Sequence, residues 1–99
     1  MKLIIIQQAK FELFDAVDYY EDKQAGLGSK LLEEVKLHIQ WINKNPQIPR
    51  LRQNSYRRVN LKVFPFYIPY LIRGITIWVL AIANSHRSPE YWINRTEED

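Results

Sequence analysis

The hydrophobic pattern of the chain changes its period at Asn45-Pro46, and this change constrains the fold more than any other feature of the sequence. Before it, apolar residues over Ala9–Tyr20 and over Leu27–Ile42 recur at intervals of three and four, which is typical of one face of a helix. Ala25-Gly26-Leu27-Gly28 separates the two patterns. Two amphipathic helices joined by a short turn are therefore predicted, and they should form an antiparallel hairpin. Pro46 ends the second helix because proline has no amide hydrogen to continue the ladder.

Segments rich in Val, Ile, Tyr, Phe and Trp dominate the second half of the chain, after a proline-containing loop over Gln47–Ser55. Their composition predicts three strands, Tyr56–Phe64, Phe66–Arg73 and Ile75–Asn84. Arg73-Gly74 is a suitable hairpin turn between the last two strands.

Two further features place these strands within a sheet. Ile75–Ala83 is apolar on both faces, which predicts a central strand covered on both sides. Pro65 and Pro69 favour an edge, a strand start or a bulge for their segments, because proline cannot donate to a ladder.

Leu3–Ile6, an apolar run of four residues at the start, is too short for a signal-peptide core or a membrane span and is interpreted as a strand. The cytoplasm is then the expected compartment. A chain of 99 residues does not hold two independent cores, so residues 1–99 are predicted to form one domain. Its predicted class is α+β: a strand, a helical hairpin, then a three-stranded antiparallel meander, with both helices on one sheet face. The tail from Pro89 should be a short extension that ends in an exposed, acidic Glu97-Glu98-Asp99.

Charge is distributed unevenly along the chain. The first 45 residues carry seven acids against six lysines, and no acid lies between Glu34 and Glu90. All seven arginines lie in the second half, at Arg50, Arg52, Arg57, Arg58, Arg73, Arg87 and Arg95. This asymmetry indicates a basic face for a phosphate backbone or an acidic partner, the alternative being a surface that only maintains solubility. Without cysteine there is no disulfide or thiolate chemistry, and two isolated histidines do not predict a metal site.

The same order of elements and motifs resembles that of the RelE/ParE superfamily, the toxins of type II toxin–antitoxin (plasmid stabilisation) systems. The resemblance covers nearly the whole chain. The matching segments are, in order, Ala9…Glu12-Leu13…Ala16-Val17-Asp18-Tyr19-Tyr20-Glu21, Gly26-Leu27-Gly28 with Leu31-Leu32, Asn45-Pro46 with Pro49, Tyr56-Arg57-Arg58, Phe64-Pro65-Phe66-Tyr67-Ile68, Ile77-Trp78-Val79-Leu80-Ala81-Ile82-Ala83 and His86-Arg87-Ser88-Pro89-Glu90-Tyr91-Trp92. The resemblance implies a growth-inhibiting toxin that a cognate antitoxin neutralises, with no cofactor, and that meets operator DNA only through that antitoxin.

The superfamily contains two chemistries, and the resemblance implies different site residues for each. RelE-like members cleave messenger RNA on the ribosome without a metal, and ParE-like members bind DNA gyrase. On the RelE pattern Arg50, Arg57, Arg87 and Tyr91 match family positions, and His86 would serve as the general acid. Two positions depart from that pattern, because Ile48 stands where a lysine is expected and Ser85 where an arginine is expected. Arg50 is also a poor base, since guanidinium keeps its proton at physiological pH.

The basic residues have a second interpretation, as contacts for phosphate or for the antitoxin. The candidates are Arg50, Arg52, Arg57, Arg58 and Arg87. Arg57 and Arg58 alternate across a strand, so one should face the helices or an edge, where a helix carboxylate such as Glu34 is a possible partner, and the other the open face. His86 could equally be a surface residue, and Trp92 is expected to cover the end of the sheet.

The incomplete catalytic set favours a ParE-like toxin that binds an essential replication enzyme, DNA gyrase being the expected target. Two alternatives stay open. One is a RelE-like endoribonuclease that uses Arg57, His86, Arg87 and Tyr91, and the other is a degenerate member that only binds its antitoxin.

Overall fold

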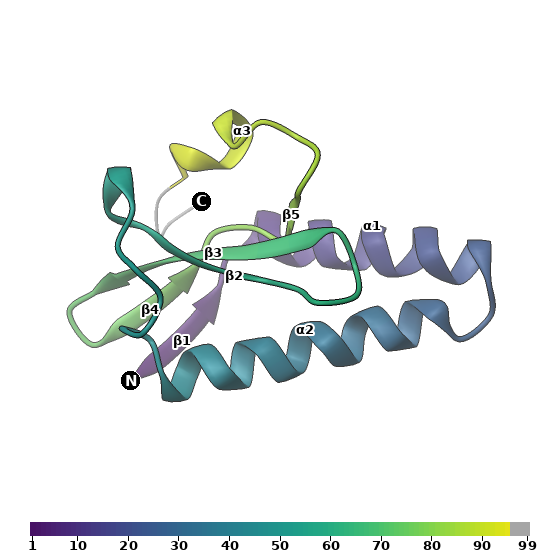
Figure 1. Cartoon of the computed structure of the whole chain (residues 1–99), viewed down its shortest axis with the longest axis horizontal. Helices are drawn as coiled ribbons and strands as arrows, with labels where there is room; N and C mark the ends of the chain where they lie inside the picture. The colour runs from purple at the N-terminus through teal and green to yellow at the C-terminus, as the bar shows by residue number, and fades with distance from the viewer. Residues whose placement is uncertain (96–99) are drawn as a thin grey trace.

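The predicted succession of a strand, a helical hairpin and further strands is confirmed by a computed structural model of the chain, which describes residues 1–95 (Figure 1). The acidic end predicted at Glu97-Glu98-Asp99 lies outside the described residues. The elements follow in the order β1 (Lys2–Ile5), α1 (Gln7–Lys23), α2 (Leu27–Lys44), the short 3-10 helix η1 (Gln53–Ser55), β2 (Arg57–Asn60), β3 (Phe66–Arg73), β4 (Thr76–Val79), β5 (Ala83–Asn84) and α3 (Glu90–Ile93).

The sheet is mixed and has the order β1-β4-β3-β2, with β5 paired to β3. The neighbouring strands β2, β3 and β4 form the predicted antiparallel meander, and β1 adds to it parallel to β4. The predicted turn at Arg73-Gly74 is present, with Gly74 at a φ of 59° that suits glycine. As predicted, β4 lies inside the sheet, whereas β2 forms one of its edges.

The prediction of one continuous strand over Ile75–Asn84 is wrong, because a bulge divides it into β4 and β5. Tyr70 pairs with Val79 and Tyr67 pairs with Ala83, so three steps along β3 face four steps on the other side. Pro69 lies opposite this extra residue, and its carbonyl accepts a hydrogen bond of 2.9 Å from the amide of Leu80. The missing amide of Pro69 therefore falls where the ladder is interrupted, and of the three positions that proline favoured, an edge, a strand start or a bulge, this strand has the bulge opposite it.

The strand predicted over Tyr56–Phe64 is also too long, since β2 ends at Asn60. The next amides bond to a helix instead of a strand: the carboxylate of Glu34 on α2 accepts hydrogen bonds from the backbone of Lys62, Val63 and Phe64. A sequence pattern of apolar residues does not indicate this competing acceptor.

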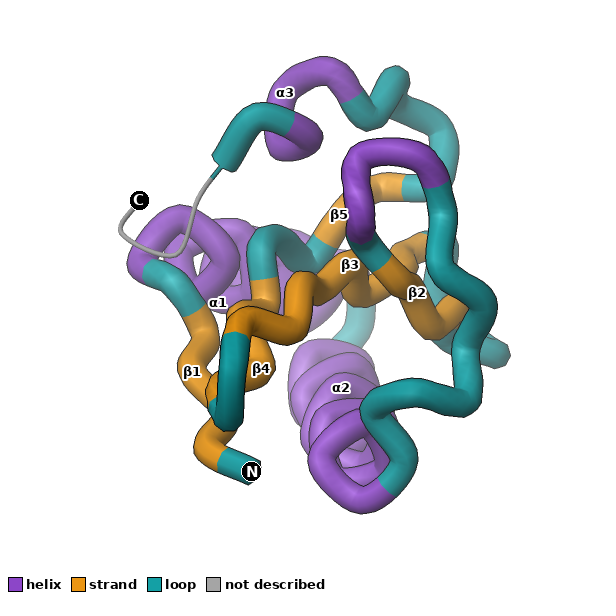
Figure 2. Tube along the Cα trace, turned by 90° about the vertical axis from the view of Figure 1, so that its left-hand side faces the viewer, coloured by secondary structure: helices purple, strands orange, loops and turns teal. Residues whose placement is uncertain are grey.

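Helices lie on both sides of the sheet, α1 and α2 on one side and α3 on the other (Figure 2). On one face α1 and α2 bury their apolar stripes, as predicted, against β3 and β4. The other face carries α3, whose Trp92 is fully buried and donates a hydrogen bond of 2.9 Å from its Nε1 to the hydroxyl of Tyr67. Trp92 thus completes a second small core with Tyr67, Leu71 and Leu80. It covers a face of the sheet, not the end of the sheet that was expected.

Candidate functional site

An apolar groove of about 780 Å³ runs between α2 and the edge strand β2. Its walls come from α2, from Val59 and Asn60 on β2, and from the loop at 62–64. Large apolar side chains face solvent along it, since Leu37 is 55%, Trp41 40% and Val63 79% exposed. Solvent-exposed apolar residues gathered in one groove are typical of a partner-binding surface.

The groove exists because α2 has two apolar faces, one that is buried and one that is exposed. Leu31, Val35 and Ile42 are buried in the core shared with α1 and the sheet. Leu37 and Trp41 follow each other by four residues on another face of the helix, where the sheet has already ended at β2. Apolar residues are therefore left without a cover on this side.

Glu34 holds one wall of the groove in place from the middle of the stretch of α2 that lines it. Its carboxylate accepts a hydrogen bond of 2.8 Å from the backbone amide of Lys62 and so fixes the loop at 62–64 that forms this wall. Lys30, Glu33 and Lys62 also line the groove. Because the Glu34 carboxylate is bound to backbone amides, its charge is already partly neutralised there.

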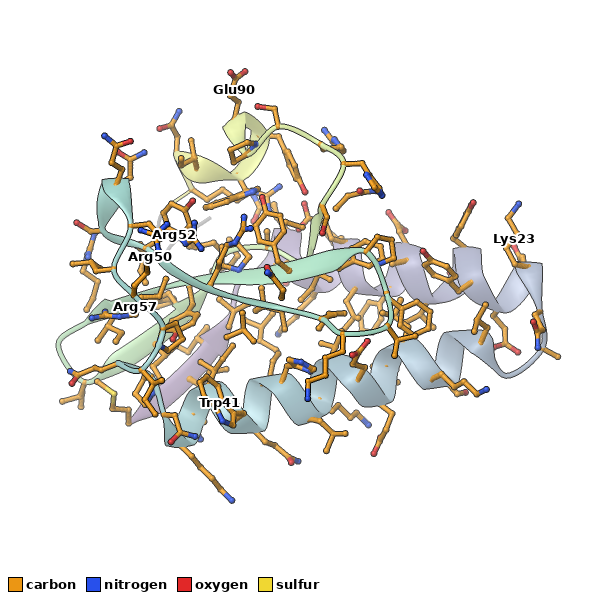
Figure 3. All side chains as sticks on the ribbon, in the orientation of Figure 1. Lys23, Trp41, Arg50, Arg52, Arg57 and Glu90 are labelled. Atoms are coloured by element: carbon orange, nitrogen blue, oxygen red, sulfur yellow. The ribbon has the colours of Figure 1, made fainter. Side chains whose placement is uncertain are left out.

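Beyond Trp41, after the C-terminal end of α2, the chain forms a basic loop, defined here as residues 46–56. Figure 3 shows Arg50, Arg52 and Arg57 near one another at this end of the molecule, with Lys23 at the far end of the helical hairpin. The Nε of Arg57 donates a hydrogen bond of 2.9 Å to the carbonyl of Pro49, which links β2 to the loop. Tyr70 fixes the loop from below, its hydroxyl donating to the carbonyl of Pro46 at 2.7 Å.

Burial makes the phenol of Tyr70 a weaker acid than an ordinary tyrosine. Burial raises the pKa of the Tyr70 phenol to about 12, although the Arg57 guanidinium acts in the opposite direction. The phenol thus stays neutral and continues to donate to the loop at physiological pH.

The opposite face of the sheet carries two arginines that lie on tyrosine rings. The guanidinium of Arg58 lies 4.3 Å from the ring centre of Tyr67, and that of Arg87 lies 3.9 Å from the ring centre of Tyr91. Both are cation–π contacts, which hold the charge in place while leaving guanidinium nitrogens for another ligand. Among residues 1–95 the buried Nε of Arg58 has no hydrogen-bond partner.

Tyr91 is positioned by the strand beneath it. Its hydroxyl accepts a hydrogen bond of 3.2 Å from the backbone amide of Asn84 on β5. Burial raises the pKa of the Tyr91 phenol above its ordinary value, against the opposing effects of the Asn84 amide and of Arg87. A neutral phenol can donate a proton or a hydrogen bond, but it is a weak base near neutral pH.

The structure divides the residues predicted from the RelE pattern between two sheet faces. Arg87 and Tyr91 lie together beside α3, and His86 is exposed in the turn before it, its amide donating to the Asn84 side chain at 2.8 Å. Arg57 pairs with Tyr70, which belongs to the core on the helix side, so its side chain is on the other face. Arg50 and Arg52 lie with Arg57 in or beside the basic loop.

The prediction that Arg57 and Arg58 point to opposite faces is confirmed. The suggested ion pair between one of them and Glu34 is wrong. Arg57 donates to Pro49 instead, and Glu34 accepts backbone amides of the loop.

Two residues of these surfaces were not singled out from the sequence. Leu37 lies four residues before Trp41 on the otherwise polar side of α2, and two large apolar residues at this spacing indicate a second contact surface. Tyr67, as the support of Arg58 and the acceptor for Trp92, requires knowledge of how the two sheet faces are filled.

No group of three His, Cys, Asp or Glu side chains suited to a metal ion occurs in the described part of the chain. The helices within residues 1–95 are all too short or too polar to cross a membrane.

Comparison with known proteins identifies the fold. No protein-family model and no curated protein matches the sequence. Among solved structures, the chain is similar to one from the chromosomal ParDE toxin–antitoxin system of P. aeruginosa, with a TM-score of 0.66 and 22% sequence identity, covering 85% of this chain and 95% of that chain. The chain has the RelE/ParE-like fold. Within this RelE/ParE-like fold, the groove beside β2 and the arginine–tyrosine pairs near α3 are the two candidate binding surfaces.

Proposed function

We propose that this chain is the toxin of a type II toxin–antitoxin system, that it is ParE-like, and that it inhibits growth by binding an essential replication enzyme, DNA gyrase being the expected target. The observation that carries this proposal is the separation of the basic residues. Arg57 is bound to Pro49 on the helix side of the sheet, while Arg87 and Tyr91 lie beside α3 on the other side. Cleavage of RNA needs its base, acid and phosphate-binding cations around one phosphate, whereas inhibition by binding does not.

The antitoxin is proposed to cover the groove. An apolar surface that runs from Leu37 to Trp41 and ends at the basic loop fits a segment that is both apolar and acidic. The fold similarity to a chain of a ParDE system supports a partner of this kind. Contact with operator DNA would occur only through the antitoxin.

RelE-like cleavage of messenger RNA on the ribosome is the second candidate, because Arg87 and Tyr91 are in contact. In that case Arg87 would bind phosphate, and Tyr91 or the exposed His86 would give a proton to the leaving 5′-oxygen. No cofactor is needed for either candidate.

The test is induction of the chain without its antitoxin, with methionine and thymidine incorporation followed in parallel. A ParE-like toxin should lower thymidine incorporation first, and the purified chain should inhibit supercoiling by gyrase. A prompt fall in methionine incorporation, abolished by Arg87→Ala, would replace this proposal with RNA cleavage. If the chain stops neither process but still binds the protein encoded beside it, it is a degenerate member that acts only as an antitoxin-binding module.

A further inference from the structure

We infer that the antitoxin binds by adding a β-strand to the free edge of β2, through an extended segment in which apolar and acidic residues alternate. This inference rests on the proposed function, because it specifies the form of the partner in the same groove. It is carried by the hydrogen bonding of the edge, by the position of α2 and by the charges around Arg58.

The backbone N–H and C=O groups of Arg58 and Asn60 point outward from the edge of the sheet, away from β3. The carbonyl of Pro69 accepts a hydrogen bond from the amide of Leu80, so the hydrogen-bonding groups of Pro69 face β4. Because these groups alternate in direction along a strand, those of Ile68 and Tyr70 face β2. The partners of these neighbours are Val59 and Arg57, and the residues that alternate with them therefore face outward.

The ends of the strand agree with this assignment. The amide of Leu61 donates to Phe66 of β3 at 2.9 Å, in phase with Val59, and the carbonyl of Tyr56 points outward and accepts from Arg52 at 2.8 Å. Within the described residues, Arg58 and Asn60 have no backbone partner on the outer side. An open edge of this kind is a template for a further strand.

The open stretch has defined limits. Before Arg58, the outward carbonyl of Tyr56 is already hydrogen-bonded to Arg52. After Asn60, the amide of Lys62 is already hydrogen-bonded to the Glu34 carboxylate. At about 3.4 Å per residue, the space between these limits accepts a segment of roughly four residues. This length favours a short added strand over pairing along a whole domain edge.

α2 provides a surface on which such a strand could pack. A strand beside β2 would continue the sheet over the groove, and its residues on the Val59 side would point toward Leu37 and Trp41. These two side chains are exposed because the sheet ends one strand before it has covered α2. The residues on this side of the partner should be apolar.

The other side of the added strand would lie next to Arg58. Its guanidinium rests on the Tyr67 ring, and its buried Nε has no partner among residues 1–95. A carboxylate next to this guanidinium would balance its positive charge. Since residues alternate between faces, the apolar side toward α2 and the acidic side toward Arg58 define the partner as a segment of alternating apolar and acidic residues.

Amide hydrogen exchange measured by NMR, with and without the antitoxin encoded beside this chain, tests this inference. The amides of Arg58 and Asn60 should exchange rapidly in the free chain and be slowed roughly tenfold or more in the complex. Val59, whose amide already bonds to β3, should be slow in both states and serves as the internal control. Unchanged exchange at Arg58 and Asn60 in a saturated complex would overturn strand addition.

Affinity measurements with Asn60→Pro give a second test. The substitution removes an outward amide that β3 does not use and blocks the approach of another strand, while Asn60→Ala keeps the amide. We expect Asn60→Pro to weaken antitoxin binding at least roughly tenfold and Asn60→Ala to stay within about threefold. Thermal unfolding of both variants shows whether they are folded, and if Asn60→Pro does not fold, the exchange measurement alone decides.

Trp41→Ser separates failure of this inference from failure of the proposed function. If Trp41→Ser weakens binding but Asn60→Pro does not, the antitoxin occupies the groove without adding a strand, for example as a helix. If neither folded variant alters the affinity, or if the chain has no antitoxin, the proposed groove itself is wrong.

Discussion

At the scale of single residues, two polar side chains tie surface segments beside the groove to the helix and the sheet. Glu34 binds the backbone amides of the loop at 62–64, and Tyr70 binds the carbonyl of Pro46 at the start of the basic loop. Each of these connections can be tested by one substitution.

Removal of the Glu34 carboxylate should loosen the loop at 62–64, which forms one wall of the groove. Glu34→Ala leaves the amides of Lys62 and Val63 without their acceptor, and we expect it to lower the free energy of unfolding by about 1 to 2 kcal/mol. Glu33→Ala, at an exposed neighbour on the same helix, should change it by less than about 0.5 kcal/mol. Urea unfolding measures both, and equal effects of the two variants would contradict the role given to Glu34.

The raised pKa of Tyr70 predicts a loss of stability in alkaline solution. Between the ordinary pKa of 10.0 and the folded value of about 12, the unfolded chain releases the phenolic proton and the folded chain retains it. The folded state is then disfavoured as pH rises, by up to about 3 kcal/mol once the folded group also ionises. Below pH 10 this contribution is fully present.

Tyr70→Phe is the variant that isolates this contribution. It should cost about 1 kcal/mol near pH 8, through loss of the hydrogen bond to Pro46, but lose less stability than the wild type between pH 10 and 12. Urea unfolding at these pH values, with tyrosine absorbance as a record of ionisation, provides the measurement. Parallel alkaline curves for the two proteins would show that Tyr70 does not titrate as described.

What the sequence could predict at this scale was alternation, because it depends only on neighbours along a strand. Arg57 and Arg58 were correctly assigned to opposite faces on that basis. The partners of Glu34 and Arg57 could not be predicted, since each is a backbone group 8 or more residues away whose position depends on the fold of a loop.

At the scale of elements, the period of the hydrophobic pattern predicted the helices and most of the strands. It did not predict the ends of strands where backbone groups form hydrogen bonds outside the regular ladder. Phe66–Arg73 has the predicted limits, whereas Ile75–Asn84 is divided by a bulge. Pro69 was the available signal, but it identifies its own strand and leaves open that the bulge lies on the neighbour. The apolar groove along α2 was missed because a periodic analysis seeks one buried stripe, and α2 has a second apolar surface at Leu37 and Trp41.

The turn between α1 and α2 offers a test of helix packing against helix propensity. A Cβ added at Gly28 would lie 2.6 Å from the carbonyl oxygen of Val17 and 3.0 Å from the Cβ of Glu21. Alanine normally stabilises a helix relative to glycine by about 1 kcal/mol, but here the two helices would have to separate. We therefore expect Gly28→Ala to lower the unfolding free energy by about 1 to 3 kcal/mol.

Gly26→Ala is the matched control, because nothing lies within 4 Å of its added Cβ. Its φ of 89° makes it a strained site for alanine, so a loss of about 1 kcal/mol is expected from the backbone alone. Chemical unfolding of both variants would decide. If Gly28→Ala is as stable as the wild type or more so, the close approach of α1 and α2 does not limit this position.

At the scale of the whole molecule, the sheet separates two basic surfaces. The basic loop with Arg50 and Arg52 lies at the end of the groove, and Arg58 and Arg87 lie on tyrosines of the other face. The uneven charge along the chain predicted a basic face but could not show that there are two surfaces, because their separation depends on which side of a strand each arginine occupies. An antitoxin strand at the edge of β2 would lie next to Arg58 on one side and next to the basic loop at one end.

This arrangement predicts that antitoxin binding depends on salt and that the dependence belongs to one end of the molecule. Screening should weaken the affinity by roughly tenfold between about 0.05 and about 0.5 M NaCl, because the arginines around the groove meet acidic residues of the partner. The double variant Arg50→Ser/Arg52→Ser should reduce this dependence and leave the part that comes from Arg58, whereas Lys23→Ser, which removes an exposed cation at the distant tip of the helical hairpin, should leave it unchanged. Isothermal titration calorimetry over the salt series measures both. An affinity that does not respond to salt, with the loss confined to Trp41→Ser, would mean that apolar contacts along α2 hold the partner and that the basic loop is free for the toxic target.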